Sequence, residues 1–510
     1  MPEEAARVPP SRTHGLVVLG MCFAAAALSL LLPFAESSDE WSWLIWGRQV
    51  RELDLQLAGG TAWKPLPVLF TTAVSALGDA APQVWLVLAR GAGLSAFVAA
   101  CRVGTRLDSR AAGIIGAAAL LLFSPGAEWL GRLLPGASEP LIVALVLWGI
   151  DRHLHGHRLQ ALGLGCLAAL GRPEPWPLVI VYAALIWRSQ SWPRRALITS
   201  AVASVPALWL GGGLWGAGDP LAAVHNAQSA VAHKSAGPRS AREVHLLGFL
   251  AFGLVRTAAV VILPMWVGAT VAWGRAVHML RQGNGNEGAR VTVALGIGIA
   301  GWFLIVLAGG FVGLPVVPRF VGAPAAVVSV LAGVGAAQLV RSAKGRGARL
   351  FVALAMTIAA APFVITRVAK LVAHVDPQTY QFKTEPGLAE ALATSDAKRR
   401  LRACDDKVLV RNVKPRTRRI ETAWRLGIPI ADVRRLRGSE LTTVRQALVI
   451  VGNGDPSVPP AGRTAYRRAQ AAAPGRWRRV ALAGKWAVYE VGCRPSERNL
   501  AAISDGDKHH

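Results

Sequence analysis

Cysteine is scarce in this sequence, and no group of cysteines and histidines is spaced like the ligands of a metal ion. Only 5 of the 510 residues are cysteine. Three of them, Cys22, Cys101 and Cys166, fall within or at the ends of apolar runs, where small core residues are expected. The sequence therefore predicts no metal centre of the Cys and His type.

Acidic residues are also few, with 30 Asp and Glu against 56 Lys and Arg, which gives a formal net charge of +26. A charge of this size suggests nucleic acid as a partner. The basic residues, however, lie in short loops between apolar runs and in the C-terminal region. We therefore predict anionic lipids as partners of this charge, and no nucleic acid.

Apolar residues dominate the chain, at 53% of the sequence with a mean hydropathy of +0.38. The first apolar run, Leu16–Ala35, has no small-x-small cleavage site before Glu36, so we predict a retained anchor rather than a signal peptide. Further runs lie near 83–101, 112–126, 138–150, 160–171, 175–187, 197–214, 258–274, 291–310, 320–340 and 350–371. The sequence predicts an all-α polytopic membrane protein with about eleven transmembrane helices.

Lysine and arginine collect in five clusters, which begin at Arg102, Arg152, Arg188, Arg275 and Arg341. With the N-terminus in the cytoplasm, eleven spans place all five clusters on the cytoplasmic side, as the positive-inside rule requires. We therefore predict a multi-pass protein of the plasma membrane with a cytoplasmic N-terminus. The first outer loop, 36–82, and the C-terminal region are then extracytoplasmic.

The first outer loop carries the most distinctive residues. Asp39 and Glu40 open it, and Lys64 stands among prolines at its end. The apolar spacing over Glu40–Leu57 predicts an amphipathic helix on the membrane surface, and Leu66–Leu77 predicts a second interfacial helix. The tryptophans of the loop suit the aromatic belt of a membrane protein, and they are Trp41, Trp43, Trp46 and Trp63.

These motifs together resemble the GT-C glycosyltransferases, above all the protein O-mannosyltransferase and aminoarabinose transferase type. The resemblance rests on Asp39-Glu40, on Gly47-Arg48 and on Lys64-Pro65-Leu66-Pro67, which enters a short helix. Two later stretches agree with it, Gly171-Arg172-Pro173-Glu174 and Pro318–Pro324. Phe320 stands where tyrosine is usual in the family, and Leu66 where a second proline is common.

The resemblance implies a membrane enzyme that takes a sugar from a polyprenyl-phosphate donor on the extracytoplasmic side. The acceptor is a hydroxyl of a lipid, a cell-wall glycan or a protein. Such transfer needs a base for the hydroxyl and positive charge for the departing phosphate. Asp39 matches the first acidic position of the family and is the predicted base, with inversion at the sugar because a retaining route recruits a second carboxylate.

Each candidate residue also has a structural alternative. Glu40 is either a helper of the base or a charge that suits a helix N-terminus, and Asp39 itself suits a helix N-cap. Lys64 is predicted to bind the donor phosphate, or to be an interfacial lysine. Arg319 has the same predicted role, with an interfacial arginine as the alternative.

Further acidic and polar candidates come from position rather than motif. Glu139 and Glu128 lie in the second outer loop, where the family often keeps a second acidic residue. Arg172 and Glu174 are either part of the site or a structural ion pair inside the bundle. We predict no obligatory metal, although the oxygens of Asp39-Glu40 also suit Mg²⁺ or Mn²⁺.

Two rival functions remain. A lipid-linked-sugar flippase or transporter predicts internal repeats and charges in the middle of the membrane. The sequence has no convincing repeat, and its charges inside apolar runs are few, chiefly Arg90 and Arg367. A non-catalytic scaffold that binds glycan is the second rival.

The composition changes after the last apolar run. We predict a transmembrane domain over 1–372, a polar linker at 373–384, a small extracytoplasmic α/β domain at 385–497 and a disordered tail at 498–510. Strands are expected at Lys407–Arg411, Ala447–Gly452 and Trp486–Val491, and a disulfide between Cys404 and Cys493. The many arginines of this domain predict either an anionic binding surface or a solvated basic face.

Overall fold

The computed structural model divides the chain into two compact units. Its described residues are 12–32, 37–121, 128–234, 255, 258–312, 314, 316–404, 407–411, 416–436, 444–452, 477–483 and 486–493. The first unit contains Met1–Leu32, Ala62–Phe70 and Leu77–Val375. The second contains Pro33–Thr61, Thr71–Ala76 and Asp376–His510. The predicted tail at 498–510 lies outside the described residues.

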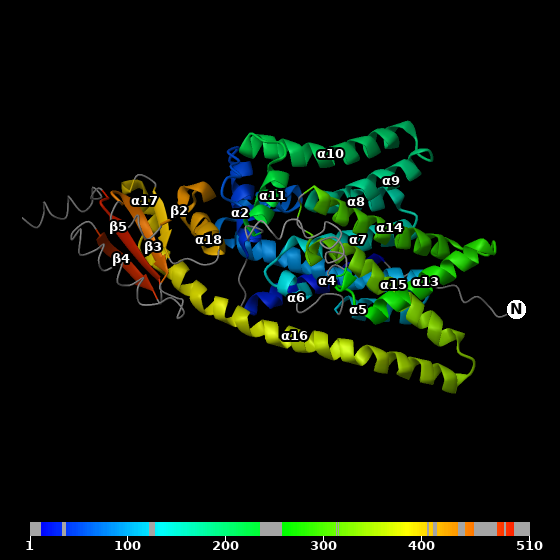
Figure 1. The fold of residues 1–510 in the computed structure, drawn as a ribbon. Helices are drawn as coiled ribbons and strands as arrows, with labels where there is room; N and C mark the ends of the chain where they lie inside the picture. Colours follow the sequence, from blue (N-terminus) through cyan, green and yellow to red (C-terminus); the bar gives the residue numbers. More distant parts are fainter. Residues whose placement is uncertain are drawn as a thin grey trace, which may run out of the picture. The chain divides into compact units, whose positions relative to one another are not determined.

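The first unit is a bundle of helices, labelled in Figure 1. Its α-helices and 3-10 helices in chain order are α1 (Arg12–Leu28), η1 (Ser29–Leu31), α3 (Pro65–Val74), η2 (Ser75–Ala80), α4 (Ala81–Leu107), α5 (Arg110–Leu120), α6 (Glu128–Leu133), α7 (Ser138–Leu154), α8 (Arg158–Gly171), α9 (Trp176–Trp187), α10 (Trp192–Ala217), α11 (Ala222–Lys234), α13 (Leu263–Arg281), α14 (Glu287–Phe311), η4 (Pro318–Val321), α15 (Gly322–Ser342) and α16 (Arg346–Thr394). Of these helices, the segment Thr71–Ala76 and the part of α16 from Asp376 onward belong to the second unit. Local signals set several ends: Ser109 and Asn286 cap α5 and α14 by accepting a backbone N–H, and Gly218 ends α10 in the left-handed conformation.

Five helical segments of the described chain are long and apolar enough to cross a membrane. They are Pro65–Leu107, Trp192–Ala217, Glu287–Phe311, Pro318–Ser342 and Arg346–Ala369. Four shorter apolar helices, such as Gly15–Leu31 and Arg110–Leu120, have 10–17 residues. A helix of that length falls short of a hydrocarbon core of roughly 30 Å. The helices confirm the membrane class, whereas the predicted number of eleven spans is not confirmed.

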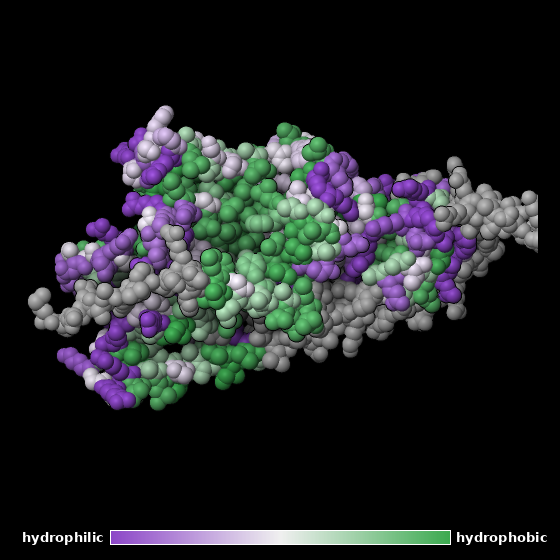
Figure 2. Space-filling view, turned by 180° about the vertical axis from the view of Figure 1, so that it is seen from behind, coloured by the Kyte–Doolittle hydropathy of each residue, from purple (hydrophilic) through white to green (hydrophobic). Residues whose placement is uncertain are grey.

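Helix α15 forms the centre of this bundle. In its most apolar stretch 89% of the residues are buried, compared with 0% in the corresponding stretch of α16. Glycines let its neighbours approach closely, since a Cβ on Gly335 would clash with the backbone of Gly268 in α13 and one on Gly333 with that of Gly116 in α5. Apolar side chains instead cover much of the outer surface of the bundle (Figure 2), as expected for a protein solvated by lipid.

The second unit combines three helices with a mixed sheet. Its elements are α2 (Ser38–Arg51), α17 (Ala397–Ala403), β1 (Val408–Arg411), α18 (Arg416–Leu426), η5 (Ile430–Asp432), β2 (Val433–Arg435), β3 (Ala447–Gly452), β4 (Trp477–Ala483) and β5 (Trp486–Val491). The strand order is β2-β1-β3-β5-β4, and Figure 1 shows these strands side by side. Strand β1 runs parallel to β2 and β3, whereas β5 is antiparallel to β3 and β4.

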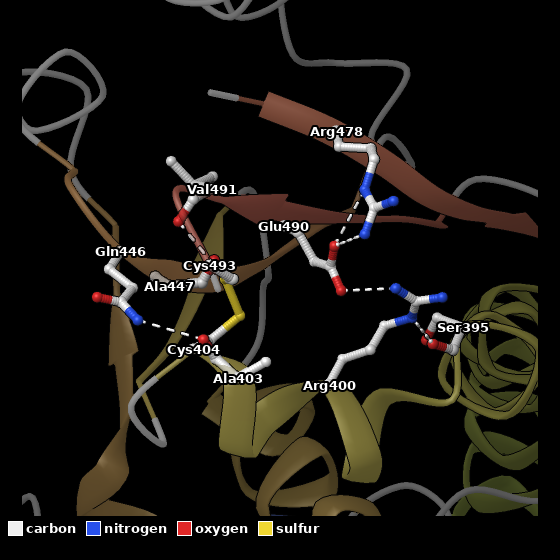
Figure 3. The surroundings of a disulfide bond; sticks show 10 residues. All are labelled: Ser395, Arg400, Ala403, Cys404, Gln446, Ala447, Arg478, Glu490, Val491 and Cys493. Atoms are coloured by element: carbon white, nitrogen blue, oxygen red, sulfur yellow. Dashed lines mark hydrogen bonds and ion pairs between the residues drawn. A yellow bond between two sulfur atoms is a disulfide. The ribbon is translucent and has the colours of Figure 1, made fainter. Parts of the chain in front are cut away.

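The three predicted strands are present, and the sequence missed the two edge strands. Both edges carry adjacent arginines, Arg434-Arg435 in β2 and Arg478-Arg479 in β4, which obscure the apolar pattern. Charged edge strands are a common protection against pairing with another chain. The predicted disulfide is confirmed: Cys404 and Cys493 are bonded with their Cα atoms 4.6 Å apart (Figure 3).

Two predictions about the chain's segments differ from the structure. The range 373–384, expected as a polar linker, lies within the continuous helix α16. Extending an existing helix adds one hydrogen bond per residue without a new nucleus, and Leu388 and Leu392 near its end are buried. The helix expected at Glu385–Arg402 is interrupted, because Asp396 adopts a positive φ between α16 and α17.

The tryptophans of the segment 36–82 are core residues rather than an interfacial belt. Trp41, Trp43 and Trp46 of α2 are buried, as is Trp63. Trp46 Nε1 donates to the carbonyl of Gln56 at 3.0 Å. The predicted surface helix therefore exists as α2, but it is enclosed by protein, because helical spacing of apolar residues does not distinguish lipid from protein as the covering partner.

Candidate active site

A polar cluster lies among the apolar helices of the first unit, and prolines set the backbone around it. Arg172 ends α8 with an extended backbone (φ −154°, ψ 147°), as the following Pro173 requires. Pro175 then leads into α9, which places Glu174 in the turn between the two helices. Lys64 immediately precedes Pro65, the first residue of α3, and Glu139 lies in the first turn of α7.

Lys64 is buried and contacts the start of α7. Its Nζ donates to Ser138 Oγ at 2.9 Å and lies 3.9 Å from Glu139 Oε1. Ser138 itself is fully buried. An amine held this way is not an interfacial lysine with its head in water, so the structural alternative for Lys64 does not describe its environment.

Arg172 joins the two carboxylates of the cluster. Its Nη1 donates to Glu139 Oε1 at 3.2 Å and its Nη2 to Glu174 Oε1 at 3.0 Å. Its Nε lies 3.2 Å from Glu174 Oε2, so the pair with Glu174 is bidentate. The predicted ion pair between Arg172 and Glu174 is therefore present, and it extends to a third residue.

Phe320 connects this network to Arg319. The Arg172 guanidinium carbon lies 4.2 Å from the centroid of the Phe320 ring, and that of Arg319 lies 5.6 Å from it. Cations over an aromatic face are attracted by its quadrupole. Phenylalanine at this position, where the family usually has tyrosine, thus supplies an apolar face for two guanidinium groups.

Among the side chains that the structure describes, the cluster carries more positive than negative charge. Its cations are Lys64, Arg132, Arg172 and Arg319, and its carboxylates are Glu139 and Glu174. The charges of Lys64, Arg132, Arg172 and Arg319 all act on the carboxylate of Glu139. Lys64, Glu139, Arg172 and Glu174 are each at most 9% exposed. The charges of these four buried residues balance, and the half-buried Arg132 and Arg319 add two positive charges beside them. Partly desolvated positive charge favours an anion, and guanidinium groups bind phosphate in two-pronged geometry. We call these six residues the cationic cluster.

Asp39 and Glu40 belong to the second unit, where they begin α2. Ser37 is the N-cap: its Oγ accepts from the Asp39 N–H at 3.3 Å, and its own N–H donates to Glu40 Oε2 at 2.7 Å. This is a complete capping box. Glu40 is fully buried in this role, whereas Asp39 is half-buried one residue earlier in the first turn. Ser37 rather than Asp39 is therefore the N-cap, and the helix-terminal role predicted for Glu40 is observed.

The structure thus joins Lys64, Glu139, Arg172 and Glu174 by direct contacts and adds Arg319 through Phe320. The backbone of Glu128 begins α6, and its side chain lies outside the described residues. Sequence reasoning missed Ser138 and Arg132. The only sequence signal for both was their position within the segment 128–140, which also contains Glu139, and neither belongs to a motif.

The described residues contain no group of three or more His, Cys, Asp or Glu side chains that could hold a metal ion. This result concerns protein ligands alone. A metal bound partly by a phosphate donor needs only one or two carboxylates.

No protein-family model and no curated protein matches the chain. Solved structures of GT-C glycosyltransferases do resemble it. ArnT from Cupriavidus metallidurans bound to undecaprenyl phosphate is similar over 95% of this chain and 100% of its own, with 12% sequence identity and a TM-score of 0.46. The same enzyme in the apo state gives 13% identity and a TM-score of 0.47 over the same shares of both chains.

The archaeal oligosaccharyltransferase AglB from Archaeoglobus fulgidus is a second similar structure. Its complex with an inhibitory peptide and a dolichol-phosphate is similar over 86% of this chain and 70% of its own, with 11% identity and a TM-score of 0.41. At this degree of similarity the activities of these proteins are not transferred to this chain.

Proposed function

We propose that this protein is a membrane glycosyltransferase that moves a sugar from a polyprenyl-phosphate carrier to an acceptor hydroxyl on the extracytoplasmic face. The observation that supports this most is the cationic cluster, a buried charge network with two additional half-buried arginines within a bundle of apolar helices. A polyprenyl-phosphate sugar has the matching chemistry, since it combines an anionic phosphate with a long apolar chain. The resemblance of the Asp39-Glu40 and Lys64-Pro65 motifs to those of the GT-C glycosyltransferases supports the same reaction.

In this reaction the cluster binds the phosphate. Lys64, Arg172 and Arg319 neutralise the negative charge that grows on the phosphate as the glycosidic bond breaks. Glu139 and Glu174 keep Lys64 and Arg172 in place while the site is empty, because buried charges need partners. The two carboxylates thus orient the cations rather than take part in proton transfer.

Asp39 is the proposed base. It removes the proton of the acceptor hydroxyl as the oxygen attacks the anomeric carbon, and the phosphate leaves from the opposite side with inversion. Glu40 is engaged in the capping box and helps by holding the first turn of α2. The acceptor is a lipid, a cell-wall glycan or a protein hydroxyl.

The test is sugar transfer by the purified full-length protein from a panel of radiolabelled polyprenyl-phosphate sugars to extracted membrane and wall acceptors. Wild type is compared with Asp39→Asn and with Asp54→Asn, the same change at an exposed aspartate of the second unit. We expect one donor to support transfer and only Asp39→Asn to lower it, by roughly 10²–10⁴-fold. Equal transfer by wild type and Asp39→Asn would reject Asp39 as the base.

The rival functions give different results in the same experiment. A flippase moves the labelled lipid across reconstituted vesicles without forming a glycoside. A scaffold binds glycan, and Asp39→Asn changes nothing measurable. We expect neither pattern.

The reaction is also proposed to need no divalent metal. Transfer should persist after treatment with a chelator. Loss of transfer that one added ion, Mg²⁺ or Mn²⁺, restores would overturn this part of the proposal.

A further inference from the structure

Helix α18 of the C-terminal region packs directly against α2 within the second unit. The ring centroids of Trp41 in α2 and Trp424 in α18 lie 6.2 Å apart. Each ring also faces an arginine of the opposite helix: the Arg48 guanidinium carbon lies 5.2 Å from the Trp424 centroid, and that of Arg425 lies 5.9 Å from the Trp41 centroid. Two tryptophans and two arginines thus alternate between the helices.

The two segments are also tied through the backbone. Arg48 Nη1 lies 3.4 Å from the carbonyl oxygen of Trp424, and its Nη2 lies 3.5 Å from that of Ile428. Trp424 lies in the last turn of α18 and Ile428 lies two residues beyond the helix end, a place where the helix dipole favours a positive charge. On the other side, Arg419 of α18 donates to the carbonyl of Gly59, beyond the end of α2.

The partner surface on α18 is itself held in place by a buried carboxylate. Glu421 is buried, and it pairs with Arg418 at 2.9 Å and with Arg425 at 2.8 Å. Glu421 therefore holds the Arg425 side chain in the position in which it faces Trp41. A contact surface prepared in this way loses little side-chain freedom when it forms.

Trp41 immediately follows Glu40, so this contact lies in the same helical turn as the acidic motif. We propose that α18 is a positioning element for that motif, in which Trp424, Arg425 and Arg48 orient the first turn of α2 and hence Asp39. The inference rests on the proposed function of Asp39 as the base. Small displacements of a reacting group have large effects, since an error of about 1 Å can lower a rate roughly 10²-fold.

The C-terminal region thereby takes part in the reaction, and the Gly47-Arg48 motif has a physical role in the packing of α2. Gly47 allows close packing, because a Cβ there would lie 2.5 Å from the backbone carbon of Thr71. Arg48 ties the same turn to α18. Neither residue needs to touch the substrate.

The test compares Trp424→Ala and Trp424→Phe with wild type in the full-length protein. Arg434→Gln, at an exposed arginine of the same unit, is the control. Two quantities are measured: hydrogen exchange of the amides in α2, and the kcat and donor KM of sugar transfer. We expect Trp424→Ala to speed exchange in α2 by about tenfold, the size of one lost aromatic and cation contact, and to lower kcat with little change in donor KM.

Trp424→Phe keeps an aromatic ring and should restore both quantities in large part. Should Trp424→Ala fail to fold, Arg48→Gln removes the two contacts with the α18 carbonyls without opening a core cavity and gives the same test. Unchanged exchange in α2 would overturn the inference, and so would faster exchange with an unchanged kcat. If wild-type protein transfers no sugar from any donor, the proposed function fails, while the exchange measurement still decides whether α18 orders α2.

Discussion

Arg172 Nη1 donates to Glu139 Oε1 across 3.2 Å, although 33 residues separate the two along the chain. The same guanidinium group holds Glu174 on its other side. One side chain therefore links the end of α8 to the start of α7 and fixes two buried carboxylates. Its loss affects both folding and the charge of the cationic cluster.

Arg172→Gln should accordingly destabilise the protein and weaken its binding to polyprenyl phosphate. Removing one partner of a buried ion pair costs about 3–5 kcal/mol, because it leaves an uncompensated buried charge. Thermal unfolding in detergent and binding of a labelled polyprenyl phosphate are the measurements. Arg188→Gln, at an exposed arginine, is the matched control and should change neither. Unaltered lipid binding in folded Arg172→Gln would contradict the role of the cluster.

The capping box at the start of α2 gives Glu40 a structural role, whereas Asp39 is the proposed base. Glu40→Gln keeps an acceptor for the Ser37 N–H and should change stability little, whereas Glu40→Ala removes it and should cost about 0.5–2 kcal/mol. Unfolding midpoints of the two variants provide the measurement. A loss of transfer in Glu40→Gln as large as that in Asp39→Asn would show that Glu40 also takes part in proton transfer.

Close packing at Gly47 predicts a position-specific effect of one methyl group. Gly47→Ala should destabilise the protein by about 1–3 kcal/mol, because the new Cβ has no room beside Thr71. Gly163→Ala in α8 is the control, since nothing lies within 4 Å of a Cβ at that position. There the change should be neutral or slightly stabilising, as alanine favours helix over glycine. Thermal unfolding of both variants decides the comparison.

The disulfide should be a main source of stability in the second unit. It closes a loop between residues that are 89 positions apart. In the chain-entropy model, loops of this size are stabilised by about 4–5 kcal/mol. The double variant Cys404→Ser/Cys493→Ser should therefore unfold at a lower temperature than wild type. Reductant should lower the unfolding temperature of wild type to that of the double variant. Cys166→Ser tests whether loss of a buried free thiol has the same effect. Equal midpoints with and without reductant would contradict the prediction.

Glu490 makes the second unit sensitive to acid. Burial raises its pKa, but hydrogen bonds from Arg400 and Arg478 outweigh this and keep the pKa below the ordinary value (Figure 3). The unfolded chain then binds the proton more readily, so the stabilisation is complete above the ordinary pKa of about 4.3 and is lost as the pH falls through the lower folded value. Unfolding midpoints measured down to about pH 3 should fall less steeply for Glu490→Gln than for wild type. Glu52→Gln, at an exposed glutamate, should follow wild type, and a variant curve identical to wild type would rule out Glu490 as the source.

The sequence by itself determined the membrane class, the disulfide and the acidic and basic motifs. These follow from local signals: long apolar runs, two cysteines in one region, and Asp39-Glu40 and Lys64 next to characteristic partners. It also offered the ion pair of Arg172 with Glu174, which lie only two residues apart, as one of two alternatives for these residues. The strands at 447–452 and 486–491 were predictable because nearly all of their residues are apolar.

The tertiary structure alone decided which distant residues meet. Nothing in the spacing of Glu139, Arg172 and Lys64 indicates that they share one network, because that contact depends on how α7, α8 and the start of α3 pack. The spacing of the tryptophans in α2 is compatible with membrane anchors and with core residues alike, since helical periodicity does not specify whether lipid or protein covers them. Because α18 packs against α2, Trp41 is a core residue rather than a membrane anchor. The same packing places the C-terminal region beside the acidic motif.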